Sequence, residues 1–295
     1  MRKALSVLSL VILISFSACK DDVVEILTVE QKDAINDQSL TEAYFNEAGD
    51  LATMAFNTPT SDQIKSGRTR GTITFEVEGD TRFNGAIVTL VTESNNDPQN
   101  PRGTITIDFG AGQTDPRGVV RKGKIIINYV GQRFAVGSST TTTFEGYTVN
   151  DVAIEGDRKV TTTAFSLSPS ISVTFSVKDT GGKATFPDQT FISRSALHTH
   201  TITLGNTIGA TTWKVEGTAS GITRAGYDYV SLVTRPLIFR TECAFQGYQL
   251  PAEGELLFTV SATPITLNFG DEGAQCNNVL SVSIENKSQN ITVGN

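Results

Sequence analysis

Histidine is scarce in this chain of 295 residues, which has only two, His198 and His200. On a β-strand these positions share a face, and a zinc ion held there would need a third ligand that no other histidine supplies. No serine has the spacing of a nucleophile elbow, and no glycine-rich loop opens a helix as a phosphate-binding loop does. We therefore expect no catalytic residue, no metal site and no cofactor. We place the histidine pair on the solvent face of its strand.

Clusters of basic residues are also absent. The chain has 24 Lys and Arg against 31 Asp and Glu, which gives a net charge of −7. Because neutralisation of phosphates by Lys and Arg provides most of the affinity for nucleic acid, we expect no nucleic acid partner. The acidic, glycine-containing loops at 108–115 and 268–278 offer oxygen ligands that calcium could use, but glycine with aspartate is also ordinary turn chemistry.

A long apolar run is missing at the N-terminus. The apolar run at residues 4–14 has eleven residues, whereas a membrane-spanning helix needs about twenty. The run follows Arg2 and Lys3, which is the order found in a signal peptide. Small residues then precede Cys19, an arrangement that resembles the lipobox of bacterial lipoproteins. The resemblance implies that residues 1–18 are a signal peptide and that Cys19 carries the lipid.

Lys20, Asp21 and Asp22 directly follow this cysteine. They resemble the short acidic export tag that carries lipoproteins of the Bacteroidota to the outer face of the outer membrane; a solvated start to a linker is the alternative. We expect a lipid-anchored protein of the outer membrane, exposed at the cell surface. In an oxidising compartment Cys243 and Cys276 are expected to form a disulfide, with two free buried thiols as the alternative.

Helical periodicity is confined to residues 23–58. Thr28 precedes Gln31, and Ser39 precedes Glu42, by the spacing of a capping box. Apolar residues after Ser39 recur at helical spacing and form one stripe: Leu40, Tyr44, Ala48, Leu51, Ala52 and Ala55. We interpret residues 19–68 as a lipidated tether that contains this helix. The helix is either a spacer that lifts the body off the membrane or an element packed against the body.

From residue 69 onward the hydrophobic period changes to two. Polar and apolar residues alternate at 72–77, 104–107, 172–177 and 199–204, which is typical of strands with one buried face and one solvent face. Clusters of Gly, Asn and Asp interrupt these runs about every 8–14 residues, which favours antiparallel hairpins. We predict an all-β, antiparallel, β-sandwich-like body preceded by a short helical N-terminal segment.

The body contains an internal repeat. The sequence Ile-Thr-Ile-Asp-Phe-Gly at 105–110 returns at 265–270 as Ile-Thr-Leu-Asn-Phe-Gly, and each copy continues into a glycine-containing loop and another alternating stretch. A shorter echo places Glu-Gly after an apolar residue, at 77–79, 154–156 and 215–217. Hairpin chemistry alone could produce the shorter echo. The longer match predicts two related modules, residues 69–168 and 169–295, with a boundary near 165–170.

Several motifs, taken in order, resemble a family of Bacteroidota surface lipoproteins. They lie at 104–110, 115–118, 121–125, 147–150 and 154–156, and then at 235–237, Cys243, Gly254, 268–270 and 276–278. The tail of this family usually reads Cys-Asp-Asn where this chain has Cys276, Asn277 and Asn278. The resemblance implies the surface address and the β-rich fold, and it implies no activity.

Trp213, Tyr227 and Tyr229 are candidate residues of a ligand platform. Tyr227 and Tyr229 would share a strand face, and flat rings beside polar residues suit stacking on a sugar. Packed positions in the core or at its rim are the alternative.

The leading hypothesis for function is a surface-anchored, non-enzymatic protein that binds or scaffolds a glycan or a protein outside the cell. The sequence defines neither the ligand nor the oligomeric state. The alternatives are an extracellular hydrolase that uses carboxylates on glycans, and an open β shell that handles lipid.

Overall fold

The computed structural model describes residues 26–58, 72–93, 99–248 and 250–292. The expected signal peptide 1–18, the lipidation site Cys19 and the export tag Lys20 to Asp22 lie outside these residues, as do residues 59–68 of the expected tether. Among the helices of the described residues, none is long and apolar enough to cross a membrane.

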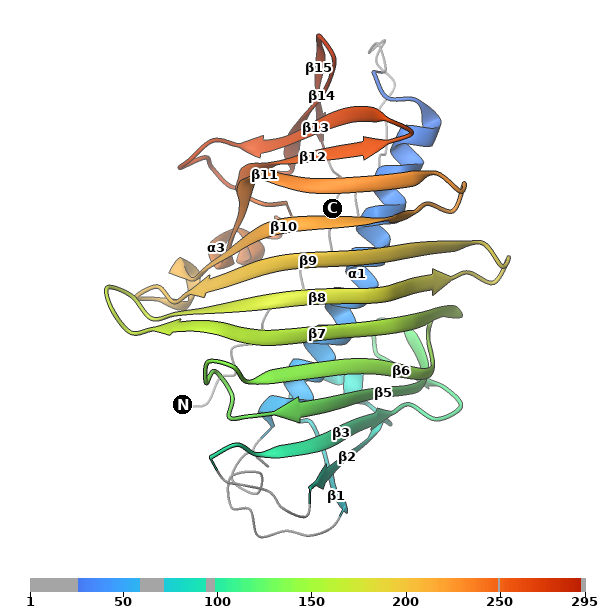
Figure 1. The fold of residues 1–295 in the computed structure, drawn as a ribbon, viewed down its shortest axis with the longest axis vertical. Helices are drawn as coiled ribbons and strands as arrows, with labels where there is room; N and C mark the ends of the chain where they lie inside the picture. Colours follow the sequence, from blue (N-terminus) through green and yellow to red (C-terminus); the bar gives the residue numbers. More distant parts are fainter. Residues whose placement is uncertain (1–25, 59–71, 94–98, 249, 293–295) are drawn as a thin grey trace. The chain divides into compact units, whose positions relative to one another are not determined.

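Fifteen strands form one antiparallel sheet in which strands consecutive in the chain are neighbours (Figure 1). The order runs from β1 through β2, β3 and β5 to β15, and the short β4 pairs with β5. The strands are β1 (Thr72–Phe75), β2 (Ile87–Thr92), β3 (Arg102–Asp108), β4 (Gln113–Thr114), β5 (Val120–Val130), β6 (Ser139–Val149), β7 (Val152–Ser166), β8 (Ser172–Thr185), β9 (Phe191–Thr203), β10 (Thr212–Ile222), β11 (Asp228–Arg240), β12 (Glu253–Val260), β13 (Thr263–Gly270), β14 (Val279–Ile284) and β15 (Lys287–Thr292). The all-β, antiparallel class is confirmed, and the strands form one sheet instead of the two facing sheets of a sandwich.

One long helix, α1 (Val29–Asn57), precedes the strands. It begins at the predicted capping box: the Thr28 N–H donates to Gln31 Oε1 at 2.9 Å, and the Gln31 N–H donates to Thr28 Oγ1 at 3.2 Å. The second capping box at Ser39 was a wrong prediction, because Ser39 lies inside the continuous helix. The remaining helical turns are η1 (Thr81–Phe83), η2 (Ile208–Ala210) and α3 (Thr241–Phe245), which lie in connections between strands.

The chain divides into two compact units. Within the described residues, the first unit takes Tyr44–Thr162 and Asp179–Phe191, and the second takes residues 26–43, Thr163–Lys178 and 192–292. The change of unit at Thr163 lies near the predicted module boundary. However, the return of Asp179–Phe191 to the first unit means that the two units are not consecutive in sequence.

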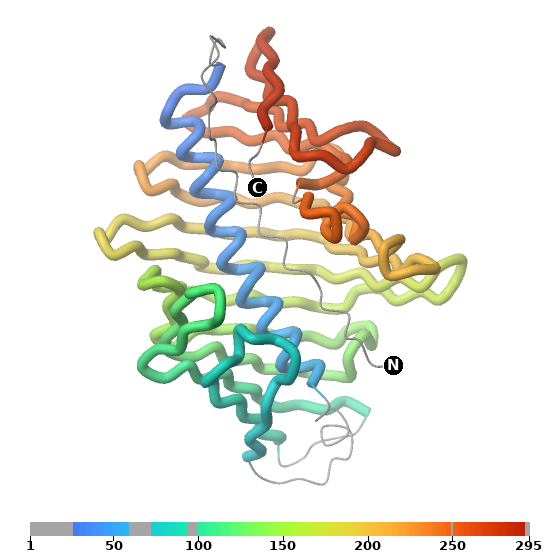
Figure 2. The backbone as a smooth tube through the Cα atoms, turned by 180° about the vertical axis from the view of Figure 1, so that it is seen from behind, coloured from blue at the N-terminus to red at the C-terminus, as the bar shows by residue number. Residues whose placement is uncertain are grey.

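Each unit has its own hydrophobic core, and α1 contributes to both. In the first unit Phe45, Leu51 and neighbouring alanines of α1 pack against inward side chains such as Ile105 and Ile127. In the second unit Ala34 and Ile35 of α1 pack against side chains of β10 to β14, among them Phe258. In Figure 2 the part of α1 that belongs to each unit lies against the strands of that unit. The helix is therefore packed against the body, which was the second of the two hypotheses for this segment.

The two copies of the six-residue repeat share a side-chain hydrogen bond, although the backbone differs at the final glycine, with φ +57° at Gly110 and +132° at Gly270. Each forms the end of a strand, β3 or β13, with its phenylalanine buried. The side chain at the fourth position then accepts a hydrogen bond from the glycine N–H two residues on: Asp108 from Gly110 at 2.8 Å, and Asn268 from Gly270 at 2.9 Å. This hydrogen bond is one that Asp and Asn accept equally well. The repeat is therefore structural, and it places one equivalent hydrogen bond in each unit.

At two of its three positions the Glu-Gly echo lies opposite a β-bulge in the neighbouring strand. Gly217 has φ +128°, and the register of β10 against β11 shifts between Val215 and Thr218. A Cβ atom at Gly217 would lie 2.2 Å from the backbone oxygen of Leu197 on β9, so glycine is required there. Gly156 on β7 has φ +108° and the same kind of close approach, to Gly181 O. Gly79 instead lies in a turn.

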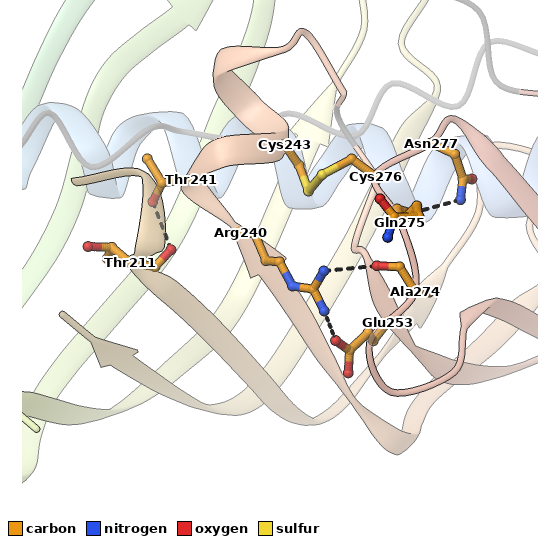
Figure 3. The surroundings of a disulfide bond; sticks show 9 residues. All are labelled: Thr211, Arg240, Thr241, Cys243, Glu253, Ala274, Gln275, Cys276 and Asn277. Atoms are coloured by element: carbon orange, nitrogen blue, oxygen red, sulfur yellow. Dashed lines mark hydrogen bonds and ion pairs between the residues drawn. A yellow bond between two sulfur atoms is a disulfide. The ribbon is translucent and has the colours of Figure 1, made fainter. Parts of the chain in front are cut away.

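Cys243 of α3 and Cys276, in the loop after β13, form a disulfide (Figure 3). The pairing predicted from the sequence is confirmed. Beside it, the guanidinium of Arg240 forms an ion pair with Glu253 and donates to Ala274 O at 2.8 Å (Figure 3). The disulfide and Arg240 thus fasten the loop after β13 to the strands of the second unit.

Candidate functional site

Tyr229 does not belong to an exposed platform. Its side chain is 1% exposed, its ring stacks on Phe258 at 5.7 Å between centroids, and its hydroxyl donates to Ser193 O at 3.1 Å. Burial raises the pKa of Tyr229 to about 12. Because β11 begins at Asp228, Tyr227 precedes the strand and lies in the turn before it, so the two tyrosines do not share a strand face.

Trp213 is also directed into the protein. Its ring packs against His200, at 5.4 Å between centroids, and against Phe239, at 6.5 Å. Its indole Nε1 is buried and makes no hydrogen bond within the described residues. The prediction that Trp213, Tyr227 and Tyr229 form one platform is therefore wrong. Trp213 and Tyr229 are instead packed against other side chains, which was the alternative interpretation.

Tyr227 alone is exposed, at 40%, and it lines an open hollow of about 290 Å³ in the second unit. The start of α1 contributes Thr28, Glu30 and Gln31, and the β12–β13 turn contributes Val260, Ser261 and Thr263. The turn that carries Tyr227 is held by Thr223, whose Oγ1 accepts from the Tyr227 N–H at 3.1 Å and whose N–H donates to Tyr227 O at 2.9 Å.

The hollow combines one aromatic ring with hydroxyl, amide and carboxylate groups. Hydrogen bonds from its own backbone and from Thr28 lower the pKa of Glu30, so this carboxylate is ionised at neutral pH. The volume lies at the lower end of the range for small-molecule pockets. A ring-shaped, hydroxylated ligand of about one sugar residue matches both the size and the groups that line it.

His198 and His200 lie on the buried face of β9, which corrects their predicted place on the solvent face. Their rings stack at 5.9 Å between centroids, and Arg194 shares the same face, whereas Leu197 points to solvent. Polar residues face inward on this strand, so the rule that apolar residues mark the buried face gives the wrong result here.

One cluster of metal-ligand side chains occurs within the described residues: Glu242, Cys243 and Cys276. Both sulfurs of this cluster are used by the disulfide, so neither is available as a thiolate ligand. In the loops considered for calcium, Asp115 pairs with Arg121 at 3.0 Å and Asp271 with Arg235 at 2.6 Å.

Buried arginines join α1 to the strands of the first unit. Arg121 on β5 forms ion pairs with Glu47 of α1 and with Asp115. Burial opposes ionisation of Asp115, but hydrogen bonds from backbone N–H groups and from Arg121 outweigh it and lower the pKa of Asp115. Arg82 of η1 likewise pairs with Asp50 of α1, at 2.6 Å, and with Asp80. Burial raises the pKa of Asp50 in spite of Arg82.

The second unit has the same kind of connection. Arg194 on β9 lies 3.8 Å from Glu42 of α1, and Asp37 of α1 accepts from the backbone N–H of Arg224 at 2.8 Å. Burial raises the pKa of Asp37. Sequence analysis missed these arginines, although Arg121 and Arg194 occupy inward positions in alternating strands, which was the pattern that could have identified them.

The comparisons with known proteins find no family model, no curated protein and no solved structure that matches the chain, so the resemblance to Bacteroidota surface lipoproteins stays a prediction.

Proposed function

We propose that this is an exported, lipid-anchored surface protein that binds a glycan, without catalysis, in the hollow beside Tyr227. The observation that carries the proposal is the exposed ring of Tyr227 among hydrogen-bonding groups from the start of α1 and the β12–β13 turn. Aromatic faces bind the apolar face of a sugar ring, and the surrounding polar groups orient its hydroxyls. The expected lipobox at Cys19 and acidic tag support the surface address.

Binding is favoured over hydrolysis by the arrangement of the carboxylates. A glycosidase places two carboxyl groups on either side of its substrate. Among the residues that the structure describes, one carboxylate lines the hollow, that of Glu30. The buried carboxylates Asp50, Asp80 and Asp115 each contact an arginine of the first unit instead.

Binding is also favoured over lipid handling, which requires an unfilled apolar interior. The core of the first unit contains large side chains of α1, among them Phe45 and Leu51, and both are fully buried. The core of the second unit contains Ala34 and Ile35 of the same helix. An acyl chain would have to displace these side chains.

A glycan array tests the proposed ligand class. The folded chain from residue 19 onward should give a saturable hit, and Tyr227→Ala should weaken it about three- to tenfold, the value of one aromatic contact. Tyr248→Ala, which removes a tyrosine that does not line the hollow, is the matched control and should bind as the wild type does. Thermal unfolding would verify that both variants are folded. No hit with folded protein, or an equal loss in both variants, would overturn the glycan proposal.

The anchor is tested separately in cells. Cys19→Ala should move the protein from the membrane fraction to the soluble fraction, because the acyl chains supply the membrane affinity. Surface proteolysis of intact cells should then distinguish the outer face from the periplasmic face. Unchanged partitioning of Cys19→Ala would contradict lipid anchoring while leaving the glycan proposal intact.

A further inference from the structure

Five large apolar side chains are exposed at one end of the central strands of the second unit. They are Phe165 near the end of β7, Leu167 and Ile171 in the β7–β8 connection, Ile208 in η2 and Phe245 in α3, and each is between 45% and 69% exposed. Single exposed apolar residues are normal on protein surfaces, but a group on adjacent connections marks an interaction surface. We call these residues the apolar tips.

Hydrogen bonds hold the three connections side by side. The Leu204 N–H, at the end of β9, donates to Ile171 O at 2.9 Å. The Thr241 N–H, at the start of α3, donates to Thr211 O at 3.0 Å, directly after η2. Figures 1 and 2 both show the β7–β8 connection, η2 and α3 at the same end of the strands.

The apolar tips are set in an almost uncharged sequence. Residues 165–171 and 203–212 contain no charged residue, and residues 241–248 contain only Glu242. The remaining positions are mainly Ser, Thr, Gly, Asn and Pro, whose hydroxyl and backbone groups can hydrogen-bond to lipid headgroups. Large apolar side chains beside such groups can enter the boundary between headgroups and acyl chains.

We propose that the apolar tips dock on a neutral lipid surface. The tips are spread over the end of β7 and three separate connections. A lipid surface accepts such scattered side chains without a complementary shape, whereas a protein partner of standard size requires about 800 Å² of matched surface. The net charge of −7 and the absence of Lys and Arg from the three segments exclude attraction to anionic headgroups as the driving force.

Docking through the tips would leave the Tyr227 hollow accessible. The tips adjoin the start of β10, and Tyr227 follows its end, so the eleven residues of β10 separate them by about 35 Å. Thr28 lines the hollow, and the eight residues from Cys19 to Leu27 span at most about 28 Å, which limits how far from the hollow a lipid on Cys19 could lie. Because about 28 Å is shorter than about 35 Å, the lipid on Cys19 and the apolar tips could reach the same membrane only if β10 is inclined to the membrane normal.

Vesicle sedimentation tests docking without the anchor. The chain from residue 19 onward with Cys19→Ser should sediment with phosphatidylcholine vesicles, and phosphatidylglycerol should not strengthen binding. Leu167→Ser and Phe245→Ser should each weaken partitioning about tenfold, the change expected when one large apolar side chain no longer leaves water. Leu197→Ser is the matched control, because Leu197 is an exposed leucine on the flat face of β9, away from the tips.

Three results would overturn the proposal. They are no sedimentation of folded protein, an equal loss with Leu197→Ser, or stronger binding as phosphatidylglycerol is added. A fourth result would come from light scattering in the absence of lipid. If the protein is a dimer and Leu167→Ser dissociates it, the apolar tips bind a second copy of the chain and not a lipid surface. Neither a blank glycan array nor a failure of lipidation at Cys19 would change these results, so this inference can fail or succeed independently of the proposed function.

Discussion

Arg121 Nη1 lies 3.0 Å from Asp115 Oδ2, and the side chain of each is 1% exposed. Glu47 of α1 is the second carboxylate on the same guanidinium. Removing the cation from such a group leaves buried negative charge without compensation. We therefore predict that Arg121→Met lowers the free energy of unfolding by about 3 kcal/mol, as measured by urea denaturation.

The control for Arg121 is its neighbour Lys122. The Nζ of Lys122 pairs with Asp151 at 2.7 Å, but both side chains are exposed to water. Lys122→Met should change the free energy of unfolding by less than about 1 kcal/mol. Equal effects of the two substitutions would contradict the structural role given to Arg121.

Asp115 should also make the protein sensitive to acid. Its pKa is lowered in the folded state, so below about pH 4, where an unfolded aspartate binds a proton, the unfolded chain takes up a proton that the folded chain resists. The stability that Asp115 contributes is present above that pH and is lost as the pH falls through its folded pKa. Asp115→Asn should be less stable at pH 7 and should lose less stability between pH 5 and 2.

Parallel stability curves for Asp115→Asn and the wild type would contradict this prediction. Asp37 and Asp50 act with the opposite sign, because burial raises their pKa values and folding favours their protonated forms. Their contributions to stability grow as the pH falls. The comparison must therefore be made between the variant and the wild type, and not on the wild-type curve alone.

Features with a local cause could be predicted from the sequence. The alternating strands and the start of α1 at Thr28 follow from neighbouring residues alone, and so does the hydrogen bond that Asp108 and Asn268 each accept. The disulfide of Cys243 and Cys276 needed one further assumption, the oxidising compartment. These predictions hold because tertiary contacts reinforce what the local pattern already favours.

Features that depend on distant residues could not be predicted. The hollow brings Thr28, Tyr227 and Ser261 together from three parts of the chain. The spacing of residues along the sequence does not predict that these three side chains lie close together. The histidines were assigned to the wrong face because Arg194 and its partner Glu42 make the covered side of β9 polar. One residue of error in the start of β11 was enough to put Tyr227 and Tyr229 on a common face that does not exist.

Gly217 should be intolerant of a side chain. An alanine there would combine a φ of +128° with a Cβ atom 2.2 Å from Leu197 O, an approach that neither backbone can relieve without breaking the β9–β10 pairing. We expect Gly217→Ala to lower the free energy of unfolding by about 3 kcal/mol. Gly226→Ala is the control, because its φ is +84° and nothing lies within 4 Å of the added atom, so only backbone strain of about 1 kcal/mol remains. A milder effect at Gly217 than at Gly226 would contradict the close approach to Leu197.

The disulfide should stabilise the whole chain by restricting the unfolded state. Cys243 and Cys276 are 33 residues apart, a loop for which the chain-entropy estimate is about 3–4 kcal/mol. The double variant Cys243→Ser, Cys276→Ser should lose that much in urea denaturation, and a reducing agent should destabilise the wild type but not the variant. Free-thiol labelling of both cysteines in the exported, unreduced protein would contradict the pairing itself.

The turn at Asn268 has a consequence for the chemical ageing of the protein. Where deamidation yields aspartate and not isoaspartate, the product is the residue that already makes the equivalent hydrogen bond at Asp108. The Gly270 N–H would keep its acceptor, and Arg235, whose Nη2 lies 3.3 Å from Asn268 Oδ1, would gain an anionic partner. The protein can therefore lose this amide to aspartate and keep the hydrogen bond to Gly270, a tolerance that would suit the surface location proposed above.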